Sequence, residues 1–157
     1  MCSQVVAVER VIDADPHAIF ELLADPRQHV LLDGSGSVRA VRTGNPTRLF
    51  KGARFGMDMR LGVSYRISNL VVEFHQDRRI AWRHFAGHRW RYTLTPVEGG
   101  PGEGSSATLV REEWDPSRVP HLWVYYRLMG FPERNRVAME ATLGRLATAL
   151  SAPDSGA

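Results

Sequence analysis

Residues 79–94 constrain the fold of this chain more than any other stretch, because their side chains repeat in mirror order about Ala86. A hairpin with a three-residue loop at positions 85–87 would bring like residues together across two strands. The predicted pairs are His84 with His88, Trp82 with Trp90 and Ile80 with Tyr92 on one face, and Arg83 with Arg89 and Ala81 with Arg91 on the other. Gly87 suits the left-handed backbone that usually ends such a loop. A two-residue loop would oppose Trp82 to Arg91 and mix the two faces, so we expect the three-residue loop.

The hairpin therefore predicts one aromatic, apolar face and one cationic, solvated face. We name Trp82, Trp90, Tyr92 and the later Trp114 the aromatic face. Cross-strand aromatic pairs stabilise a sheet by about 0.2–1 kcal/mol each, so this face could be plain packed core. Indole N–H and phenol O–H groups need polar partners, however, and a dry core supplies these poorly. The aromatic face could equally line a ligand cavity, and both interpretations stay open.

The composition is that of an ordinary globular chain. Its 157 residues are 43% hydrophobic and 24% charged, which predicts a single domain over residues 1–150 with a substantial core. The single cysteine, Cys2, permits neither an internal disulfide nor a cysteine metal site. The early charges Glu9, Arg10 and Asp13 argue against a secretory leader, and no apolar run is long enough to span a membrane. We therefore expect a cytoplasmic protein.

The charge distribution gives little sign of a polyanionic partner. The net charge of +3 and the pI near 9.5 are weakly basic, and the arginines are scattered, so nucleic-acid binding is not expected. Arg83, Arg89 and Arg91 form a basic stripe on the outer face of the hairpin. Such a stripe is usually a solvated surface, and docking of an acidic partner such as an acyl carrier protein is the alternative.

The predicted elements are a strand, two short helices, about six further strands and a long helix. Residues 5–12 are rich in β-branched side chains and predict the first strand. Asp15-Pro16 and Asp25-Pro26 each combine an N-cap with a proline and predict two helix starts, the second helix running to about residue 32. Further strands are expected at 38–42, 54–60, 65–74, in both arms of the hairpin, and at 107–114. The alternation breaks at 70–72, which predicts a bulge.

The chain is expected to end in helices. Residues 120–129 are apolar and aromatic, and Gly130-Phe131-Pro132 should separate them from a long helix that begins at Pro132. Its apolar stripe is Asn135, Met139, Leu143, Leu146 and Leu150. The segment 98–106 is expected to be a flexible connection and 151–157 a disordered tail. A curved sheet cannot bury its inner face alone, so the long helix should cover it, leaving room for a ligand between them.

This order of elements, with the residues on it, resembles the helix-grip superfamily, which includes START lipid-transfer domains, pollen-allergen proteins and bacterial polyketide cyclase/dehydrases (SRPBCC). The resemblance covers residues 5–150. It rests on IDADP at 12–16, LLADP at 22–26, GARF at 52–55, RIAW at 79–82, TLVREEWD at 108–115 and FPERN at 131–135. It implies an α+β fold: a strongly curved antiparallel sheet of about seven strands, two short helices after the first strand, and a C-terminal helix packed across the sheet over a cavity. It also implies a hydrophobic ligand and no cofactor.

Three residues are candidates for acid–base chemistry. Glu112 shares a strand face with Val110 and Trp114, where a carboxylate needs a partner or its pKa rises. A raised pKa suits a general acid or base, and a structural salt bridge is the alternative. His84 and His88 should lie at the rim near the hairpin loop, with pKa values near neutrality. Glu112, His84 and Tyr65 are therefore the tentative catalytic residues.

The other candidates should contact a ligand. Met57 and Met59 adapt to irregular shapes, and the amides of Asn69 and Asn135 could orient a polar group. The full set of predicted ligand contacts is Met57, Met59, Asn69, Trp82, His88, Trp90, Tyr92, Trp114, Trp123, Tyr126, Asn135 and Met139. The histidines stand at no recognisable metal-ligand spacing, so no metal is expected.

Three hypotheses on function follow. The first is a monomer or homodimer that binds a polyketide-, aromatic- or lipid-like molecule, with residues 120–129 as a gate hinged at 130–132. The second is a true aromatase/cyclase, in which Glu112 with a histidine or Tyr65 moves protons during aldol cyclisation and dehydration of a polyketide. The third is an interaction or stress-response module with a filled core.

Overall fold

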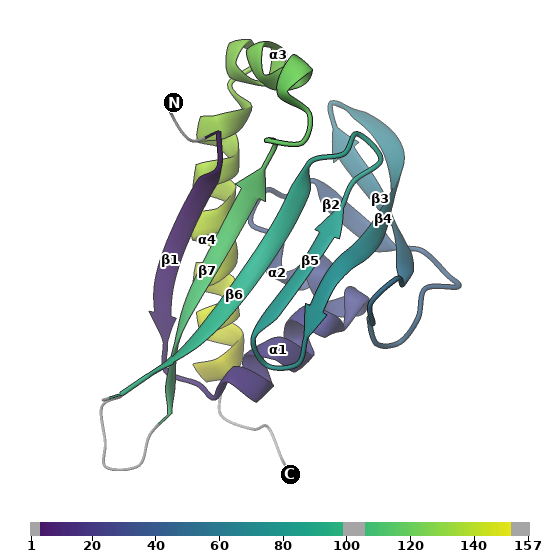
Figure 1. The fold of residues 1–157 in the computed structure, drawn as a ribbon. Helices are drawn as coiled ribbons and strands as arrows, with labels where there is room; N and C mark the ends of the chain where they lie inside the picture. The colour runs from purple at the N-terminus through teal and green to yellow at the C-terminus, as the bar shows by residue number, and fades with distance from the viewer. Residues whose placement is uncertain (1–3, 99–105, 152–157) are drawn as a thin grey trace.

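The computed structural model describes residues 4–98 and 106–151. Its strands form one antiparallel sheet of seven in the order β1-β7-β6-β5-β4-β3-β2, with the C-terminal helix α4 lying across one face (Figure 1). The strands are β1 (Val6–Ile12), β2 (Val38–Val41), β3 (Arg54–Leu61), β4 (Val63–His75), β5 (Arg79–Arg83), β6 (Arg89–Val97) and β7 (Ala107–Asp115). The helices are α1 (Pro16–Ala24), α2 (His29–Leu32), α3 (Trp123–Leu128) and α4 (Phe131–Ser151), with 3₁₀ turns at Pro26–Gln28 and Pro120–Leu122. The α+β architecture expected from the sequence is confirmed.

Two aspartates begin the short helices as predicted. Asp15 precedes Pro16, and its carboxylate accepts a hydrogen bond from the His17 N–H at 2.8 Å. Asp25 accepts from the Arg27 N–H at 2.9 Å in the same way, before a 3₁₀ turn that leads into α2. Each side chain satisfies an N–H that the start of a helix leaves unpaired. The helix expected at 26–32 is therefore present, divided between the 3₁₀ turn and α2.

The mirror hairpin has the predicted register. β5 and β6 pair Trp82 with Trp90, and Ile80 with Tyr92. The loop closes with a hydrogen bond of 3.2 Å from the His84 N–H to the His88 carbonyl, and Gly87 has a φ of +99°. That left-handed backbone is costly for a residue with a Cβ, which explains glycine at this position.

The predicted bulge is also present. The pairing of β4 with β5 shifts between Val71 and Glu73, so Val72 is the extra residue. Ile67, Asn69 and Val71 alternate toward the interior before the shift. Before the bulge, the alternation of β4 turns Asn69 toward the inner face of the sheet. The extra residue then shifts the alternation by one position in the rest of the strand.

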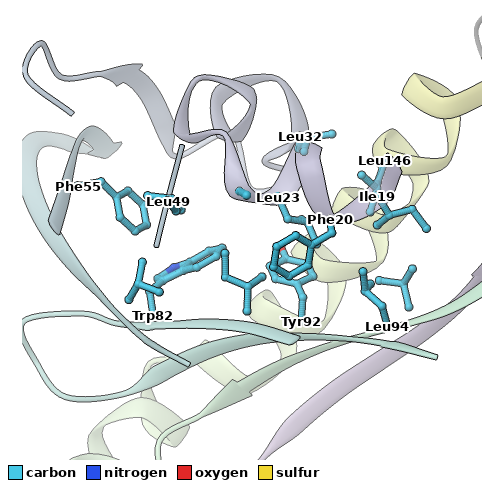
Figure 2. Packing of buried hydrophobic residues seen from close by; sticks show 14 of the residues in the cluster. Ile19, Phe20, Leu23, Leu32, Leu49, Phe55, Trp82, Tyr92, Leu94 and Leu146 are labelled. Carbon is cyan, nitrogen blue, oxygen red and sulfur yellow. The ribbon is translucent and has the colours of Figure 1, made fainter. Parts of the chain in front are cut away.

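The buried side chains form two clusters. The larger one joins α1, the inner face of the sheet and the C-terminal half of α4, and Figure 2 shows these side chains as a layer between the helices and the sheet. The smaller one lies beneath α3 and contains Trp114, Val119, Tyr126 and Met139. Gly130, with a φ of +72°, separates α3 from α4 where the break was expected, and α4 begins at Phe131.

The outer face of the hairpin differs from the expectation of a free, solvated basic stripe. Arg89 and Arg91 have side chains that are only 19% and 18% exposed, and both bind Glu73 of β4. Arg91 also lies 3.5 Å from Glu113 of β7. Glu73 faces this stripe because the bulge shifts the β4–β5 register. Two of the three arginines are thus already neutralised, and Arg83 alone of the three is exposed.

Two expected segments fall largely outside the described residues. Of the flexible connection expected at 98–106, positions 99–105 are not described. Of the tail expected at 151–157, Ser151 is the last residue of α4 and 152–157 are not described. Within the described ranges, no helix is long and apolar enough to cross a membrane.

Candidate ligand-binding site

A cavity of about 780 Å³ lies between the sheet and α4. The strands β3 to β7 contribute inward side chains, α2 and the loop after it close one side, and α3 contributes Tyr125 and Tyr126. The lining is mostly apolar and aromatic. All four members of the aromatic face line it, so this face borders open space as well as the packed core.

Glu112 is the most unusual residue of the lining. The alternation of β7 turns it inward between Val110 and Trp114, where it is 1% exposed. Its Oε1 accepts two hydrogen bonds of 2.7 Å, one from Trp90 Nε1 and one from the Tyr92 hydroxyl. Its Oε2 is buried and has no hydrogen-bond partner among the described residues. Two of the four members of the aromatic face, Trp90 and Tyr92, therefore donate to one oxygen of this carboxyl group, and the other oxygen has no partner among the described residues.

Burial raises the pKa of Glu112 to about 8. The hydrogen bonds from Tyr92 and Trp90 act in the opposite direction, and the negative charge of Asp33 adds to the rise. The cause is the high cost of an ionised carboxylate away from water. The pKa of Tyr92 is likewise raised, first by burial and then by Glu112. At neutral pH this part of the site therefore holds an uncharged carboxylic acid.

Asn69 is a second buried polar residue of the lining. It lies on β4, is 1% exposed, and its Oδ1 has no hydrogen-bond partner within the described ranges. Unpaired buried acceptors are rare in folded proteins because each loses its hydrogen bonds to water. Two residues of the mainly apolar lining, Asn69 and Glu112, thus each carry a buried polar atom without a partner among the described residues.

The two histidines of the hairpin correct one expectation. His84 and His88 both line the cavity, with ring centres 4.5 Å apart, and His88 Nδ1 lies 3.3 Å from the Tyr126 hydroxyl. Burial lowers the pKa of His84 to about 3, with a smaller effect from His88, and lowers the pKa of His88 to about 4. The expected pKa near neutrality is therefore wrong, because burial disfavours the charged imidazolium of both rings, and Tyr126 of α3 packs against His88. Both histidines are uncharged at neutral pH.

The three tentative catalytic residues all line the cavity, but they do not form one cluster. Tyr65 is on β4 and is 38% exposed, and burial raises its pKa. The sheet order places β4 three strands from β7, roughly 14 Å if the sheet were flat. His84 has His88 as its ring neighbour. The groups that contact Glu112 are instead Trp90 and Tyr92.

Most of the predicted ligand contacts lie on the cavity. Those that line it are Met57, Met59, Asn69, Trp82, His88, Trp90, Tyr92, Trp114, Tyr126 and Asn135. Trp123 and Met139 do not line it. Both belong to the smaller cluster, where the Trp123 ring lies 6.4 Å from that of Trp114 and Met139 is fully buried. The apolar stripe of a helix cannot by itself distinguish residues that meet a cavity from residues that meet a neighbouring helix.

The sequence interpretation missed His29. This residue of α2 is buried, lines the cavity and stacks on Trp82 with ring centres 5.0 Å apart. Its Nε2 lies 2.8 Å from the Leu23 carbonyl, and burial lowers its pKa. The available signal was its position one residue before an apolar run, Val30 to Leu32, inside a predicted helix. That position predicts that the His29 side chain is buried, but it does not predict that the side chain lines a cavity.

One group of possible metal ligands lies elsewhere, at the start of α1 and the β4–β5 turn. It consists of His17, Glu21 and Asp77. His17 Nδ1 lies 3.0 Å from Asp77, and Glu21 is bound by Arg48 at 2.8 Å. These contacts raise the pKa of His17 and lower that of Glu21 to about 2. The group is an ion-pair network around Arg48 rather than part of the cavity.

Comparison with known proteins finds two sequence relatives, and no family model matches the chain. They are uncharacterized proteins of Mycobacterium tuberculosis, Rv0088 of strain H37Rv at 36% identity and MT0096 of strain CDC 1551 at 35%, each over 137 residues. The aligned part covers 82% of this chain and 56% of each relative. The chain thus spans about half the length of the curated proteins that it matches.

Solved structures resemble the whole chain. Protein CV1439 from Chromobacterium violaceum matches with a TM-score of 0.66 at 18% identity, covering 96% of this chain and 99% of its own. Protein Ms6760 from Mycobacterium smegmatis matches with 0.67 at 16% identity, covering 95% and 92%. The AHSA1-like protein from Aeromonas hydrophila matches with 0.64 at 15% identity, covering 98% and 99%. At these identities the likeness concerns the fold, which is the helix-grip fold that the sequence resemblance implied.

Proposed function

We propose that this protein binds a hydrophobic small molecule in the cavity between the sheet and α4. The observation that carries the proposal is the cavity itself. Its mainly apolar lining contains an uncharged carboxyl group with one hydrogen-bonded oxygen and one oxygen without a partner among the described residues. Its volume of about 780 Å³ lies within the usual range of small-molecule sites, roughly 300–1,000 Å³. The ligand is polyketide-, aromatic- or lipid-like, in accord with the helix-grip fold.

The segment above the cavity supports a route of access. Tyr125 and Tyr126 of α3 line the cavity, whereas Val124 and Leu128 on the same helix are 65% and 82% exposed. Gly130 joins α3 to α4 with a left-handed backbone, a conformation that glycine adopts without strain. In the proposed function, α3 acts as a gate. It moves about Gly130 to open the cavity to the ligand and then returns to its packed position in the smaller cluster.

A second candidate function is catalysis of the polyketide cyclase/dehydrase type. It is favoured by the raised pKa of Glu112 and by its unpaired Oε2, which suit a general acid that also acts as a base. Tyr92 replaces His84 and Tyr65 as its partner, because Tyr92 is the hydroxyl that contacts Glu112. Under this function, Glu112→Gln abolishes turnover of a poly-ketone substrate and spares binding.

Binding is tested with a neutral fluorescent probe, N-phenyl-1-naphthylamine. The wild-type protein should bind it with enhanced emission, whereas Ala138→Phe should bind it at least about tenfold more weakly, because Ala138 of α4 lines the cavity. Ala149→Phe is the matched control, since Ala149 is an exposed alanine of the same helix. Native mass spectrometry of the purified protein would show a retained ligand. Failure of the wild type to bind the probe would support the third hypothesis, a module with a filled core.

A further inference from the structure

The hydrogen bonds around Glu112 determine where its proton lies. An indole N–H can only donate, and the Tyr92 hydroxyl is placed to donate to the same oxygen, so Glu112 Oε1 acts as an acceptor twice. In the uncharged acid, the proton must then sit on Oε2. Because Oε2 is buried and has no partner among the described residues, its O–H is an unpaired donor on a residue that lines the cavity.

The charges around the cavity decide what this donor can meet. The charged residues of the lining are Asp33 on the loop after α2 and Glu133 and Arg134 in the first turn of α4, besides Glu112 itself. Arg134 is exposed and lies over the Phe131 ring at 5.7 Å. The histidines of the lining, His29, His84 and His88, all have lowered pKa values and are uncharged at neutral pH. The two hydrogen-bond partners of Glu112 in the described chain, Trp90 and Tyr92, are both uncharged, and no cation contributes to its pKa shift.

We infer that the bound molecule presents a neutral carbonyl oxygen, as in a ketone, quinone or ester, to the Oε2–H of Glu112. This inference rests on the proposed binding function and names the chemical class of the ligand. A carbonyl oxygen can accept the hydrogen bond that the Oε2–H of Glu112 leaves unused. A carboxylate beside Glu112 would lie near the negative Asp33, whereas the cation of the described lining, Arg134, is exposed in the first turn of α4 and does not contribute to the pKa shift of Glu112.

A cationic amine is the opposing possibility, because it would favour the ionised form of Glu112. The two ligand classes predict opposite responses to pH. A carbonyl ligand needs the protonated acid, so its affinity must fall as Glu112 ionises at alkaline pH. An amine gains affinity from the same ionisation, up to the pKa of the amine.

Three naphthalene probes of nearly equal shape test this inference: 2-acetylnaphthalene, 2-ethylnaphthalene and 1-(2-naphthyl)ethylamine. Dissociation constants are measured by calorimetry at pH 6.5 and pH 9.5, with thermal unfolding recorded at both. At pH 6.5 the acetyl probe should bind about five- to tenfold more tightly than the ethyl probe, the gain of one good hydrogen bond. At pH 9.5 that advantage should disappear, and the ethyl probe should show equal affinity at both pH values.

The variant Glu112→Gln keeps a hydrogen-bond donor at this position but removes the group that ionises. The amide keeps an acceptor oxygen for Trp90 and Tyr92 and places an N–H₂ donor where Oε2 stood. This variant should favour the acetyl probe over the ethyl probe equally at both pH values. Glu9→Gln is the matched control, because Glu9 is exposed on β1 and should keep the wild-type pH profile.

The possible results distinguish the two proposals. If none of the probes binds the wild-type protein, both the binding function and the inference fail. If the acetyl and ethyl probes bind equally at pH 6.5, or the amine probe binds most tightly and gains affinity by pH 9.5, the carbonyl class is wrong and the binding function stands.

Discussion

At the scale of single residues, the site is marked by polar atoms that the fold leaves unpaired. Asn69 Oδ1 and Glu112 Oε2 are both buried and both border the cavity. An unsatisfied buried polar atom destabilises a protein by about 1–3 kcal/mol. Such a cost is tolerated where a ligand supplies the missing partner, so these atoms should limit the stability of the ligand-free protein.

Asn69→Leu should therefore stabilise the ligand-free protein. Removal of the unpaired amide oxygen at similar side-chain volume should add about 1 kcal/mol, or about 2–4 °C in Tm. Asn45→Leu is the control, because Asn45 exchanges hydrogen bonds of 2.9 and 2.8 Å with the backbone of Gly56 and should destabilise the protein when lost. Thermal unfolding measures both. A lower Tm for Asn69→Leu would mean that the amide has a structural partner in solution.

Glu112 makes stability depend on pH with a defined sign. Its pKa is about 8 in the folded protein against 4.5 for an ordinary glutamate carboxyl, so between these values the folded state holds a proton that the unfolded state has lost. Stability must fall as pH rises from about 4.5 to 8 and then level off. His84 and His88, with lowered pKa values, impose the opposite slope below pH 6.5.

The contribution of Glu112 is isolated by a difference between variants. The free energy of unfolding of the wild type minus that of Glu112→Gln, measured with urea, should decrease by roughly 3–5 kcal/mol from pH 4.5 to pH 8.5. The histidine contribution cancels in this difference. A flat difference would show that Glu112 titrates normally in the folded protein.

At the scale of elements, the loop after α2 is fixed to α4 by a close backbone approach. The Gly34 N–H donates to Thr142 Oγ1 at 2.9 Å, and a Cβ on Gly34 would lie 2.4 Å from the Ala138 carbonyl oxygen and 2.5 Å from the Thr142 nitrogen. The Asp33-Gly-Ser-Gly36 stretch therefore holds one side of the cavity against the helix. Its glycine is required by contact rather than by an unusual φ.

Gly34→Ala should destabilise the protein by about 2 kcal/mol or more, because the added methyl forces the loop away from α4. Gly144→Ala on the same helix is the matched control: a Cβ there meets only Arg10 Nη1 at 4.0 Å, and alanine favours a helix by about 1 kcal/mol over glycine. Opposite changes in Tm are expected from these two glycine-to-alanine substitutions. An equal effect of both would contradict the close approach.

The elements differ in how far the sequence could predict them. The hairpin register, the two aspartate caps and the bulge near Val72 follow from local patterns, and the structure confirms all three. The neutralisation of the arginine stripe could not be predicted without the shifted β4–β5 register, because that register determines that Glu73 faces Arg91. The lowered pKa of His84 could not be predicted either, because the local sequence does not show how deeply the hairpin loop is buried. Local patterns specify faces, whereas partners across the fold depend on packing.

At the scale of the whole molecule, the cavity is lined by members of both hydrophobic clusters. The larger one is supported by α1, the sheet and α4, while the smaller one depends on α3, a helix of only six residues. Short helices gain little stability of their own and rely on their contacts. The end of the molecule under α3 is therefore expected to open more easily than the end under α1.

Amide hydrogen exchange should reveal this difference. Amides of α3 (Trp123–Leu128) should exchange faster than those at the centre of β6, and saturation with 2-acetylnaphthalene should slow α3 selectively. The β1–β7 pairing serves as the internal reference, since it lies outside the smaller cluster over most of its length. Uniform protection across both regions would argue against α3 as the gate.

The bond from Trp90 Nε1 to Glu112 Oε1 has an optical consequence. An indole that donates to a carboxyl group senses the electric field of that group, so ionisation of Glu112 should shift the emission of Trp90. The shift would be identified as the part of the tryptophan spectrum lost in Trp90→Phe. The protein thus contains its own spectroscopic indicator of whether the acid that faces the cavity still holds its proton.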